Sequence, residues 1–350
     1  MNKPQRVTTA LMGGVPDVVP YMYNTITKEI QERIIGHEIR EPTITGLNMT
    51  GCLVTLEGEP YIEPVLSTVP EVAQFLGMDA IQIQVVPPLF VNSMVADGEA
   101  CVSAGLLTSC DALKKAKLPD PDDENLLGKI KEMIGRYKGD FAMGARIRLG
   151  ASSTIMSMGM EAIAYSMADE DGLLEYVIDM YTSWSKRFVS NLCELDFDFI
   201  WAFDDIAYTT GMMFSPQVFR DYFKAPMKEA ASAITKPWIF HSDGDYSLVL
   251  DDIIDIGARA IHPIEQGSMD TAWLHENYGD KLCLVGNIDI DYTLSKGTVE
   301  EVDAEVKMRI EQLGKNGGYI IADSNSIPNF CKAENVIAMS KAVHKYRDIY

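Results

Sequence analysis

The feature that most constrains the fold of this chain is a series of short, apolar, β-prone runs, each followed by polar or glycine residues and then by a helix-like segment. Buried strands that alternate with helices are typical of a parallel sheet covered by helices. Eight such units in 350 residues predict an α/β fold, a single (β/α)8 TIM barrel. The predicted strands are Val18–Tyr23, Ala80–Val85, Phe141–Ile147, Phe197–Phe203, Trp238–His241, Ala260–Ile264, Leu282–Val285 and Tyr319–Ala322.

The spacing of these runs is uneven, because the last five strands follow one another closely while long insertions separate the first three. The insertions, at about residues 25–78 and 86–140, are expected to hold structure of their own. Two β-hairpins near the barrel mouth are predicted within them, because paired β-prone runs flank short turn-like segments. The paired runs are Cys52–Glu57 with Tyr61–Leu66 around Gly58-Glu59-Pro60, and Leu89–Ala96 with Ala100–Leu106 around Asp97-Gly98-Glu99.

Composition and charge exclude several classes of protein. The chain is 47% hydrophobic and 23% charged, which is enough apolar material for a large core. A net charge of −21 disfavours nucleic acid and anionic membrane surfaces as partners. The N-terminus has no apolar run behind a basic start, and no window is long and apolar enough to span a membrane. Six widely separated cysteines, with no CxxC pair, indicate reduced thiols. We therefore expect a soluble, cytoplasmic protein, and the sequence leaves a homodimer open.

Polar side chains at the carboxyl ends of the predicted strands are the candidates for chemistry, because active sites of TIM barrels lie at that end. His241 and Asp243 follow the fifth strand, where alternate residues point to the same side. This geometry suits a divalent metal such as zinc, with Glu265 or Asn325 completing the ligand set. The alternative is that His241 only forms hydrogen bonds inside the mouth while Asp243 caps the following helix.

Two adjacent acids, Asp204 and Asp205, follow the fourth strand. Either is a candidate general acid, because neighbouring carboxylates in a partly dry pocket resist ionising together. The alternative is a loop acid that is held by hydrogen bonds and has no catalytic role. His262 precedes a proline inside the sixth strand and is expected to be a core or barrel-lining residue without a catalytic role.

Six segments are informative in their order and spacing: RVTTALMGGVPDVVPYM, MGMEAIAYSMADEDGLLEYVIDM, DDIAYTTGMMFSPQVFRDYFKAPMK, HSDGDYSLVLDDIIDIGARAIHPIE, VGNIDIDYTLSKGTVEEV and GGYIIADSNSIPNFCKAENVIAM. Together they resemble the uroporphyrinogen decarboxylase superfamily across nearly the whole chain. This superfamily includes that decarboxylase and the cobalamin-dependent methyltransferases that share its barrel. The resemblance implies one TIM-barrel domain over residues 1–350.

The sequence departs from both branches of this superfamily. The decarboxylase has arginines just after the first strand to hold a polycarboxylate substrate, but this chain reads YMYNTITKEI there. The methyltransferases have zinc held by a His-x-Cys pair after strand five and by a further cysteine after strand eight. This chain has His241 and Asp243 at the pair, and Asn325 near the last position. Carboxylates make a harder site than thiolates, so we expect an oxygen substrate rather than a thiol.

The resemblance therefore implies a corrinoid-dependent methyltransferase that acts with a corrinoid protein as partner. We expect O-demethylation of a small substrate such as a methoxylated aromatic compound. In this hypothesis the metal activates the leaving oxygen, and Asp204 or Asp205 protonates or orients it. The aromatic residues expected to flank an aryl ring, which are equally good core residues, are Tyr21, Tyr23, Trp201 and Tyr208.

Two other functions remain open at this stage. A decarboxylase of a carboxylated substrate would need no metal, and it would place arginine or lysine side chains in the mouth. A non-catalytic corrinoid-binding subunit is the third possibility, because the expected thiolate ligands are missing.

Overall fold

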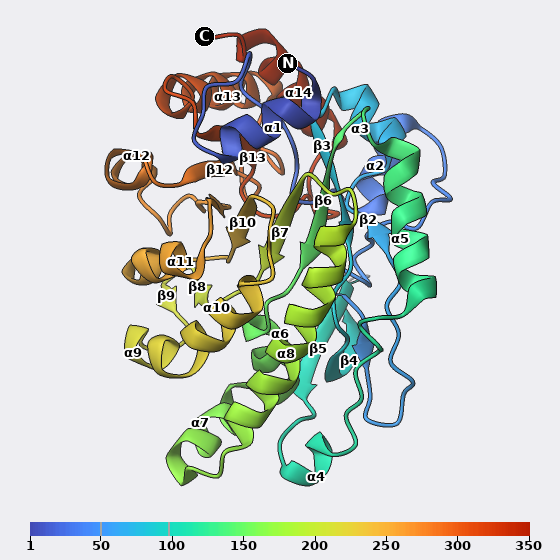
Figure 1. The fold of residues 1–350 in the computed structure, drawn as a ribbon. Helices are drawn as coiled ribbons and strands as arrows, with labels where there is room; N and C mark the ends of the chain where they lie inside the picture. The colour runs from blue at the N-terminus through green and yellow to red at the C-terminus, as the bar shows by residue number, and fades with distance from the viewer. Residues whose placement is uncertain (50, 97–98) are drawn as a thin grey trace.

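Eight strands of the computed structural model, which describes residues 1–49, 51–96 and 99–350, form one curled sheet. Seven of these strands pair in parallel, in the order β3, β6, β7, β10, β11, β12 and β13 (Figure 1). The eighth, β2, joins β3 antiparallel at the edge of the sheet. The predicted α/β barrel is confirmed, and seven of its eight predicted strands are present. The sheet contains β2 (Val65–Leu66), β3 (Ala80–Gln84), β6 (Ala142–Ile147), β7 (Phe199–Phe203), β10 (Trp238–His241), β11 (Ala260–His262), β12 (Cys283–Ile288) and β13 (Tyr319–Asp323).

The first predicted strand closes the barrel without forming a regular ladder. Tyr21 makes an isolated parallel bridge with Ile321 of β13. On its other side, the Tyr21 carbonyl accepts a hydrogen bond from the backbone N–H of Asp79 at 2.7 Å, just before β3 begins. The segment Val18–Tyr23 therefore occupies the place of a strand between β13 and β3. Proline at position 20 has no N–H to donate, which limits the ladder on this segment.

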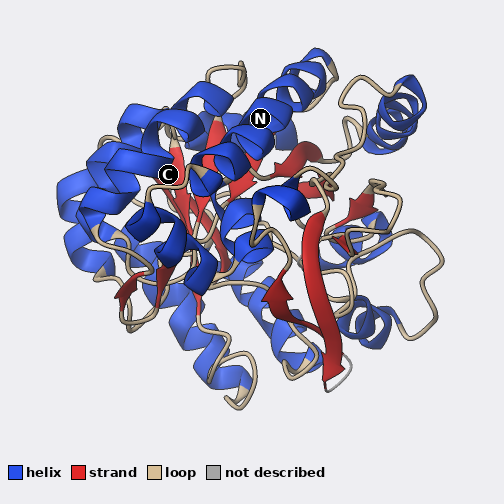
Figure 2. Cartoon of the chain, turned by 90° about the horizontal axis from the view of Figure 1, so that it is seen from below, coloured by secondary structure: helices blue, strands red, loops and turns tan. Residues whose placement is uncertain are grey.

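Helices surround the strands (Figure 2). The longer ones follow the strands they connect, as expected for βα units. Helix α1 instead lies across the amino-terminal end of the barrel, where Val7, Ala10 and Leu11 pack with Ala80 and Ala142 at the starts of β3 and β6. The amino-terminal end is thus plugged by apolar side chains, so a site can open only at the carboxyl ends of the strands.

The helices have the following bounds: α1 (Lys3–Leu11), α2 (Lys28–Ile35), α3 (Pro70–Leu76), α4 (Cys110–Leu113), α5 (Glu124–Tyr137), α6 (Ala151–Met158), α7 (Met160–Asp169), α8 (Leu173–Glu194), α9 (Pro216–Val218), the π-helix η1 (Phe219–Lys224), α10 (Ala225–Ala231), the 3-10 helix η2 (Ser247–Val249), α11 (Leu250–Ile256), α12 (Thr271–Tyr278), α13 (Val299–Leu313) and α14 (Ala333–Tyr346). None of those in the described residues combines the length and apolar character needed to cross a membrane.

One of the two predicted hairpins is present. Strands β4 (Leu89–Ala96) and β5 (Glu99–Gly105) pair antiparallel and pack against α6, while Asp97 and Gly98 of the predicted turn lie outside the described residues. The other prediction is wrong in its pairing. Strand β1 (Leu53–Val54) pairs in parallel with β4, and β2 pairs with β3, so the two arms of the expected first hairpin serve different sheets. A short strand gains more by joining an existing sheet than by forming an isolated two-stranded hairpin.

The remaining β-structure is the two-stranded sheet of β8 (Ala207–Tyr208) and β9 (Gly211–Met212), which follows β7 at the mouth of the barrel.

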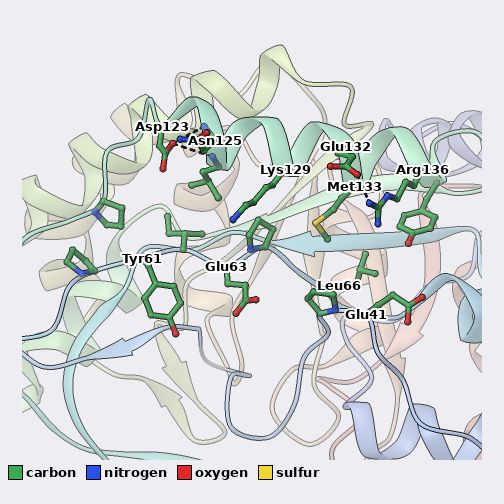
Figure 3. Close-up of a pocket in the computed structure, with 17 residues that line it drawn as sticks. Glu41, Tyr61, Glu63, Leu66, Asp123, Asn125, Lys129, Glu132, Met133 and Arg136 are labelled. Carbon is green, nitrogen blue, oxygen red and sulfur yellow. Dashed lines mark hydrogen bonds and ion pairs between the residues drawn. The ribbon is translucent and has the colours of Figure 1, made fainter.

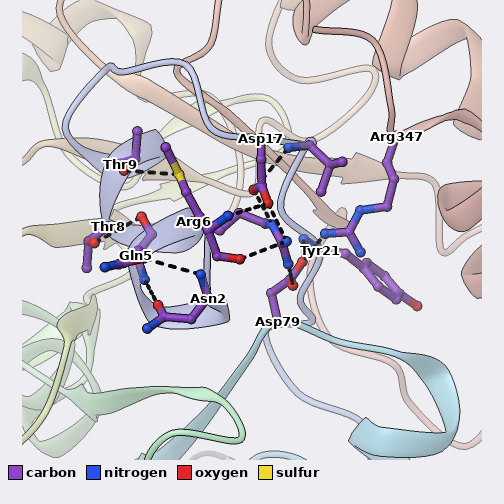
Figure 4. Close-up of polar contacts among 11 residues, drawn as sticks. Asn2, Gln5, Arg6, Thr8, Thr9, Asp17, Tyr21, Asp79 and Arg347 are labelled. Atoms are coloured by element: carbon purple, nitrogen blue, oxygen red, sulfur yellow. Dashed lines mark hydrogen bonds and ion pairs between the residues drawn. The ribbon is translucent and has the colours of Figure 1, made fainter.

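A buried acid holds the closing segment to the barrel. Asp79 accepts hydrogen bonds from the Tyr21 backbone N–H at 2.9 Å and from Arg6 at 2.6 Å, and it also pairs with Arg347. Figure 4 shows Arg6 between Asp79 and Asp17, whose carboxylate pairs with the Arg6 Nε at 2.7 Å. These contacts join α1, the closing segment, the start of β3 and the C-terminal region. Loss of the Asp79 charge would leave buried Arg347 and mostly buried Arg6 without their shared anion.

We predict that Asp79→Asn lowers the free energy of unfolding by roughly 3–5 kcal/mol, because it breaks a buried ion pair by removing one partner. Asp17→Asn is the matched control: its side chain is 35% exposed, and we expect a loss of about 1 kcal/mol or less. Urea denaturation followed by circular dichroism measures both. Equal losses in the two variants would contradict a special role for Asp79.

Candidate metal centre

Three side chains at the carboxyl ends of β7 and β10 converge on one point. One ligand atom each from Asp205, His241 and Asp243 lies within 4.8 Å of the other two. The Nε2 atom of His241 is 3.4 Å from the Asp243 Oδ1 and 3.7 Å from the Asp205 Oδ1. His241 is 4% exposed, whereas the two carboxylates are partly open to solvent. The predicted pair of His241 and Asp243 is thus brought together, with Asp205 as a third member.

The loop after β10 holds Asp243 in place through backbone contacts. The Asp243 N–H donates to Asp205 at 3.0 Å, and the Gly244 N–H donates to Glu265 at 2.9 Å. Gly244 has a φ of +76°, and a Cβ there would lie 2.1 Å from the carbonyl oxygen of Tyr208. Only glycine fits this left-handed conformation and close approach. The Gly at this position therefore lets the loop turn tightly over β8.

A second histidine fixes the tautomer of His241. The Nε2 atom of His262 faces the backbone carbonyl of Asp323 at 3.1 Å, so this nitrogen carries a proton and donates it. Its Nδ1 is then an acceptor, and it lies 2.6 Å from the Nδ1 of His241. His241 must therefore donate through Nδ1, which leaves the lone pair of its Nε2 facing the two carboxylates. This is the protonation pattern that a metal-binding imidazole needs.

The charge states of the cluster agree with this pattern. Burial, with the nearby Arg146 charge, lowers the pKa of His241 to about 4 against the opposing effect of Asp205, and burial also lowers that of His262 well below its usual value. Both rings are neutral at pH 7. Burial and the neighbouring Asp205 carboxylate raise the pKa of Asp243 well above its usual value. Neither imidazole therefore carries a positive charge that would offset the two carboxyl groups.

The arrangement fits a divalent cation. In tetrahedral zinc sites the metal lies about 2.0–2.2 Å from nitrogen and oxygen ligands, so neighbouring ligand atoms are roughly 3.4 Å apart. The His241 to Asp243 and His241 to Asp205 separations of 3.4 and 3.7 Å are close to that value. The Oδ1 atom of Asp243 is buried and has no hydrogen-bond partner in the described residues. A cation would satisfy it.

The two further predicted ligands lie at the edge of the cluster. Glu265 accepts the Gly244 N–H, and the nearby Asn325 side chain opposes the rise in the pKa of Asp243. Neither belongs to the group of three described above. Asp205, which the sequence analysis placed as a general acid, takes the third position instead.

Asp204 points away from the cluster. It is fully buried and accepts hydrogen bonds from the backbone N–H groups of Leu149 and Ser152, the latter at 2.8 Å, at the start of α6. Burial raises its pKa to about 6, against the effect of these hydrogen bonds. Its contacts match the alternative of a hydrogen-bonded loop acid, with partners on the segment that leads from β6 into α6.

The four aromatic residues predicted to flank a substrate have different surroundings. Tyr21 and Tyr23 are fully buried in the outer core and contact α14, because Met22 between them takes the inward position. Their predicted substrate contact is therefore corrected to a core role. Trp201 lies inside the barrel, with its ring centroid 4.7 Å from that of His262. Tyr208 is 55% exposed beside Gly244 at the rim.

Sequence reasoning missed three inward-facing residues. His262 is more than a barrel-lining residue, since it orients His241. Arg146 and Arg148 lie at the carboxyl end of β6 and just beyond it, almost completely buried, with their guanidinium carbons each 4.6 Å from the ring centroid of Phe203. The missed signal was the Arg-Ile-Arg sequence at the end of an otherwise apolar run.

A cavity of about 710 Å³ lies away from this cluster, on the outer side of the barrel between α5 and the segment before β2. Figure 3 shows Lys129 of α5 pointing toward the segment that carries Tyr61 and Glu63, while Arg136 lies beside Glu132 farther along the helix. Its walls carry mixed charges without a convergent ligand set. We therefore assign the candidate site by its chemistry rather than by cavity size.

We predict that His262→Phe lowers metal affinity about 10- to 100-fold, because the Nδ1–H of His241 loses its acceptor and the ring orientation is no longer fixed. Trp201→Phe is the control, since it changes the packing against His262 but keeps the hydrogen bond. Competition with a chelating dye measures the affinity of each variant for Zn²⁺. The same loss in both variants would show that packing alone matters.

We also predict that metal binding releases a proton. Burial and the Asp205 carboxylate raise the pKa of Asp243, so this carboxyl keeps its proton to a higher pH than an ordinary carboxyl with a pKa of about 4. The cation must displace that proton, and its affinity therefore rises with pH above that ordinary value. Calorimetry in buffers of different ionisation enthalpy counts the released protons. An affinity that is constant with pH would contradict the raised pKa.

Comparison with known proteins places this geometry in a family. The chain is 26% identical over 174 residues to Methylcobamide:CoM methyltransferase MtaA of Methanosarcina barkeri, and 25% identical over 174 residues to the protein of the same name from its strain Fusaro. It spans about half the length of these curated relatives, 49% in each case. A solved structure described as a methyltransferase from Methanosarcina mazei has the same fold, with a TM-score of 0.71 at 19% identity over 99% of both chains. The profile described as Uroporphyrinogen decarboxylase (URO-D) matches residues 94–346, and the chain therefore belongs to the uroporphyrinogen decarboxylase family.

Proposed function

We propose that this chain is a corrinoid-dependent methyltransferase that moves a methyl group between a small substrate and a corrinoid carried by a partner protein. The partial similarity to the methylcobamide:CoM methyltransferases supports the reaction class. The observation that carries the proposal is the convergence of Asp205, His241 and Asp243 at the carboxyl end of the barrel. We further propose that the chain acts as one barrel domain in the cytoplasm.

Asp205, His241 and Asp243 would hold a divalent metal, for which we propose zinc. Glu265 and Asn325 support the loop and Asp243 rather than completing the set of three. When bound, such a metal supplies Lewis-acid stabilisation to a negatively charged leaving group. His241 stays neutral at pH 7 and keeps its Nε2 lone pair directed at this point.

The donor set favours an oxygen substrate over a thiol. No cysteine belongs to the described group of three. Cys331, which follows β13, is buried, and this burial raises the pKa of its thiol to about 12. Cys283 lies inside the barrel, and burial likewise raises its pKa. Neither thiol ionises at neutral pH, so the site is rich in oxygen and suits an ether oxygen.

We propose a methoxylated aromatic compound as the methyl donor. In this reaction the bond between the methyl carbon and the oxygen breaks, its electron pair stays on the oxygen, and the methyl group passes to the corrinoid. Asp205 lies at the partly exposed side of the cluster and orients the leaving oxygen or the proton it finally takes. Trp201 lies below the histidine pair, and the exposed ring of Tyr208 at the rim is available to contact an aryl group.

A second candidate function is a decarboxylase of a carboxylated substrate. The observation that favours it is the presence of Arg146 and Arg148 in the mouth, where this alternative required cationic side chains. It would need no metal, so the effect of metal removal separates the two. A non-catalytic corrinoid-binding subunit would be insensitive to loss of His241 as well.

We predict that the metal-loaded protein methylates cob(I)alamin from a methoxylated aromatic donor, and that His241→Ala lowers the rate at least about 100-fold, since a metal supplies several kcal/mol of stabilisation. His37→Ala, a change of an exposed histidine, is the control. The corrinoid spectrum reports the reaction, and elemental analysis reports the metal content. No methylcobalamin from a panel of methoxy, methylamine and thioether donors, or full activity without metal, would contradict the proposal.

A further inference from the structure

A buried cation with no ion pair among the described residues lies beside the candidate metal centre. Arg146 is 2% exposed, and its Nε and NH1 atoms are buried without a hydrogen-bond partner among the residues that the structure describes. Burial and the neighbouring Arg148 lower its pKa to about 9, so the guanidinium remains charged at neutral pH. A buried charge costs several kcal/mol unless it is paired, so this position calls for an anion.

The nearby carboxyl groups of the protein do not fill this role. Asp323 and Asp205 both act on Arg146 electrostatically, but no hydrogen bond or ion pair links either to it in the described residues. Burial raises the pKa of Asp323 to about 8, so this group is mainly neutral at pH 7. Asp205 faces His241 and accepts the backbone N–H of Asp243. The anion must come from outside the chain.

A second cation, an aromatic ring and a polar side chain surround Arg146. Arg146 and Arg148 lie two residues apart, and both guanidinium groups contact the ring of Phe203. Gln84 is the register neighbour of Arg146 on β3, and its buried Oε1 also lacks a partner in the described residues. Two cations held this close repel each other, which an anion between or beside them would relieve.

A cavity lies near this region. It measures about 310 Å³ and is lined by Gln84, Val86 and Gly51, together with residues of the β4–β5 hairpin. A Cβ on Gly51 would lie 3.7 Å from the NH1 atom of Arg148, so the wall of the cavity is close to the arginine pair. The volume is at the lower end of the range for small-molecule sites. It favours a compact ligand over a tetrapyrrole.

We propose that Arg146, with Arg148 beside it, binds the carboxylate of the small substrate whose reacting group lies at Asp205, His241 and Asp243. The planar guanidinium matches the geometry of a carboxylate. The assignment of this carboxylate to the methyl donor rests on the proposed function, whereas the anion subsite rests on Arg146 itself. The substrate class is then a methoxylated aromatic carboxylate rather than a neutral ether.

The test uses 3-methoxybenzoate and its neutral counterpart 3-methoxybenzamide as probes, with binding to the zinc-loaded protein measured by calorimetry. Arg146→Met is expected to weaken binding of the benzoate about 10- to 100-fold, because one or more charge-assisted hydrogen bonds are lost. Binding of the benzamide is expected to be equal in both proteins. Arg146→Lys keeps the charge but loses the planar fork, so its loss is smaller. Arg136→Met, which removes an exposed arginine on α5, leaves the benzoate affinity unchanged.

Thermal unfolding without ligand separates a binding role from a structural one. If the role of Arg146 is to bind a ligand, the Arg146→Met variant unfolds at the same temperature as the wild type or at a higher one, because the substitution removes an unpaired buried charge. A lower unfolding temperature would assign the arginine to a structural pair and overturn the inference. Benzoate binding that is absent in the wild type, or unchanged in Arg146→Met, would also overturn it, as would tighter binding of phenylphosphonate than of benzoate.

The corrinoid assay distinguishes failure of this inference from failure of the proposed function. Selective loss of benzoate binding in Arg146→Met, together with no methylation of cob(I)alamin from any donor, would leave the carboxylate subsite standing and remove the methyl transfer. Methylation of cob(I)alamin from 3-methoxybenzamide and 3-methoxybenzoate at equal efficiency would support the methyl transfer and remove the carboxylate subsite.

Discussion

The contact on which the barrel depends is the two-way link between Asp79 and Tyr21. The Asp79 backbone donates to the Tyr21 carbonyl, and its side chain accepts the Tyr21 N–H. Two arginines from opposite ends of the chain, Arg6 and Arg347, complete the charge balance around that side chain. Because the first segment lacks a full strand ladder, these contacts hold it to the start of β3, and the bridge between Tyr21 and Ile321 holds it to β13. The ring of strand ends that forms the candidate site exists only when that gap is closed.

Much of the fold could be predicted from the sequence because its signals are local. Seven apolar runs became strands, and each of those runs can be recognised from its own residues. The pairing of the segment around residues 52–66 could not be read in this way, since its arms bind to different sheets. Pairing between distant strands depends on which edges the rest of the fold leaves open. The predicted contact of Tyr21 and Tyr23 with a substrate was wrong for a related reason. Side chains alternate along this segment, so that Met22 points inward and both tyrosine rings point outward.

The candidate site was predictable in its centre and not in its surroundings. His241 and Asp243 follow a strand end at the right spacing, and that is enough to bring them together. The choice between Asp204 and Asp205 depended on which one α6 would use for its backbone N–H groups, and the structure gives that task to Asp204. His262 and Arg146 act across neighbouring strands. Their roles follow from the register of β10 with β11 and of β3 with β6, which no local pattern specifies.

The acceptor that fixes the histidine pair is the backbone carbonyl of residue 323 and not its side chain. A carbonyl is present whatever amino acid occupies the position, so the protonation pattern of His262 and His241 is insulated from substitutions there. The protonation pattern of the two histidines depends on the backbone path of β13, and therefore on the closure of the barrel. Relatives with another residue at this position would keep the same imidazole tautomer, while the composition of the surrounding ligands is free to diverge between oxygen and sulfur.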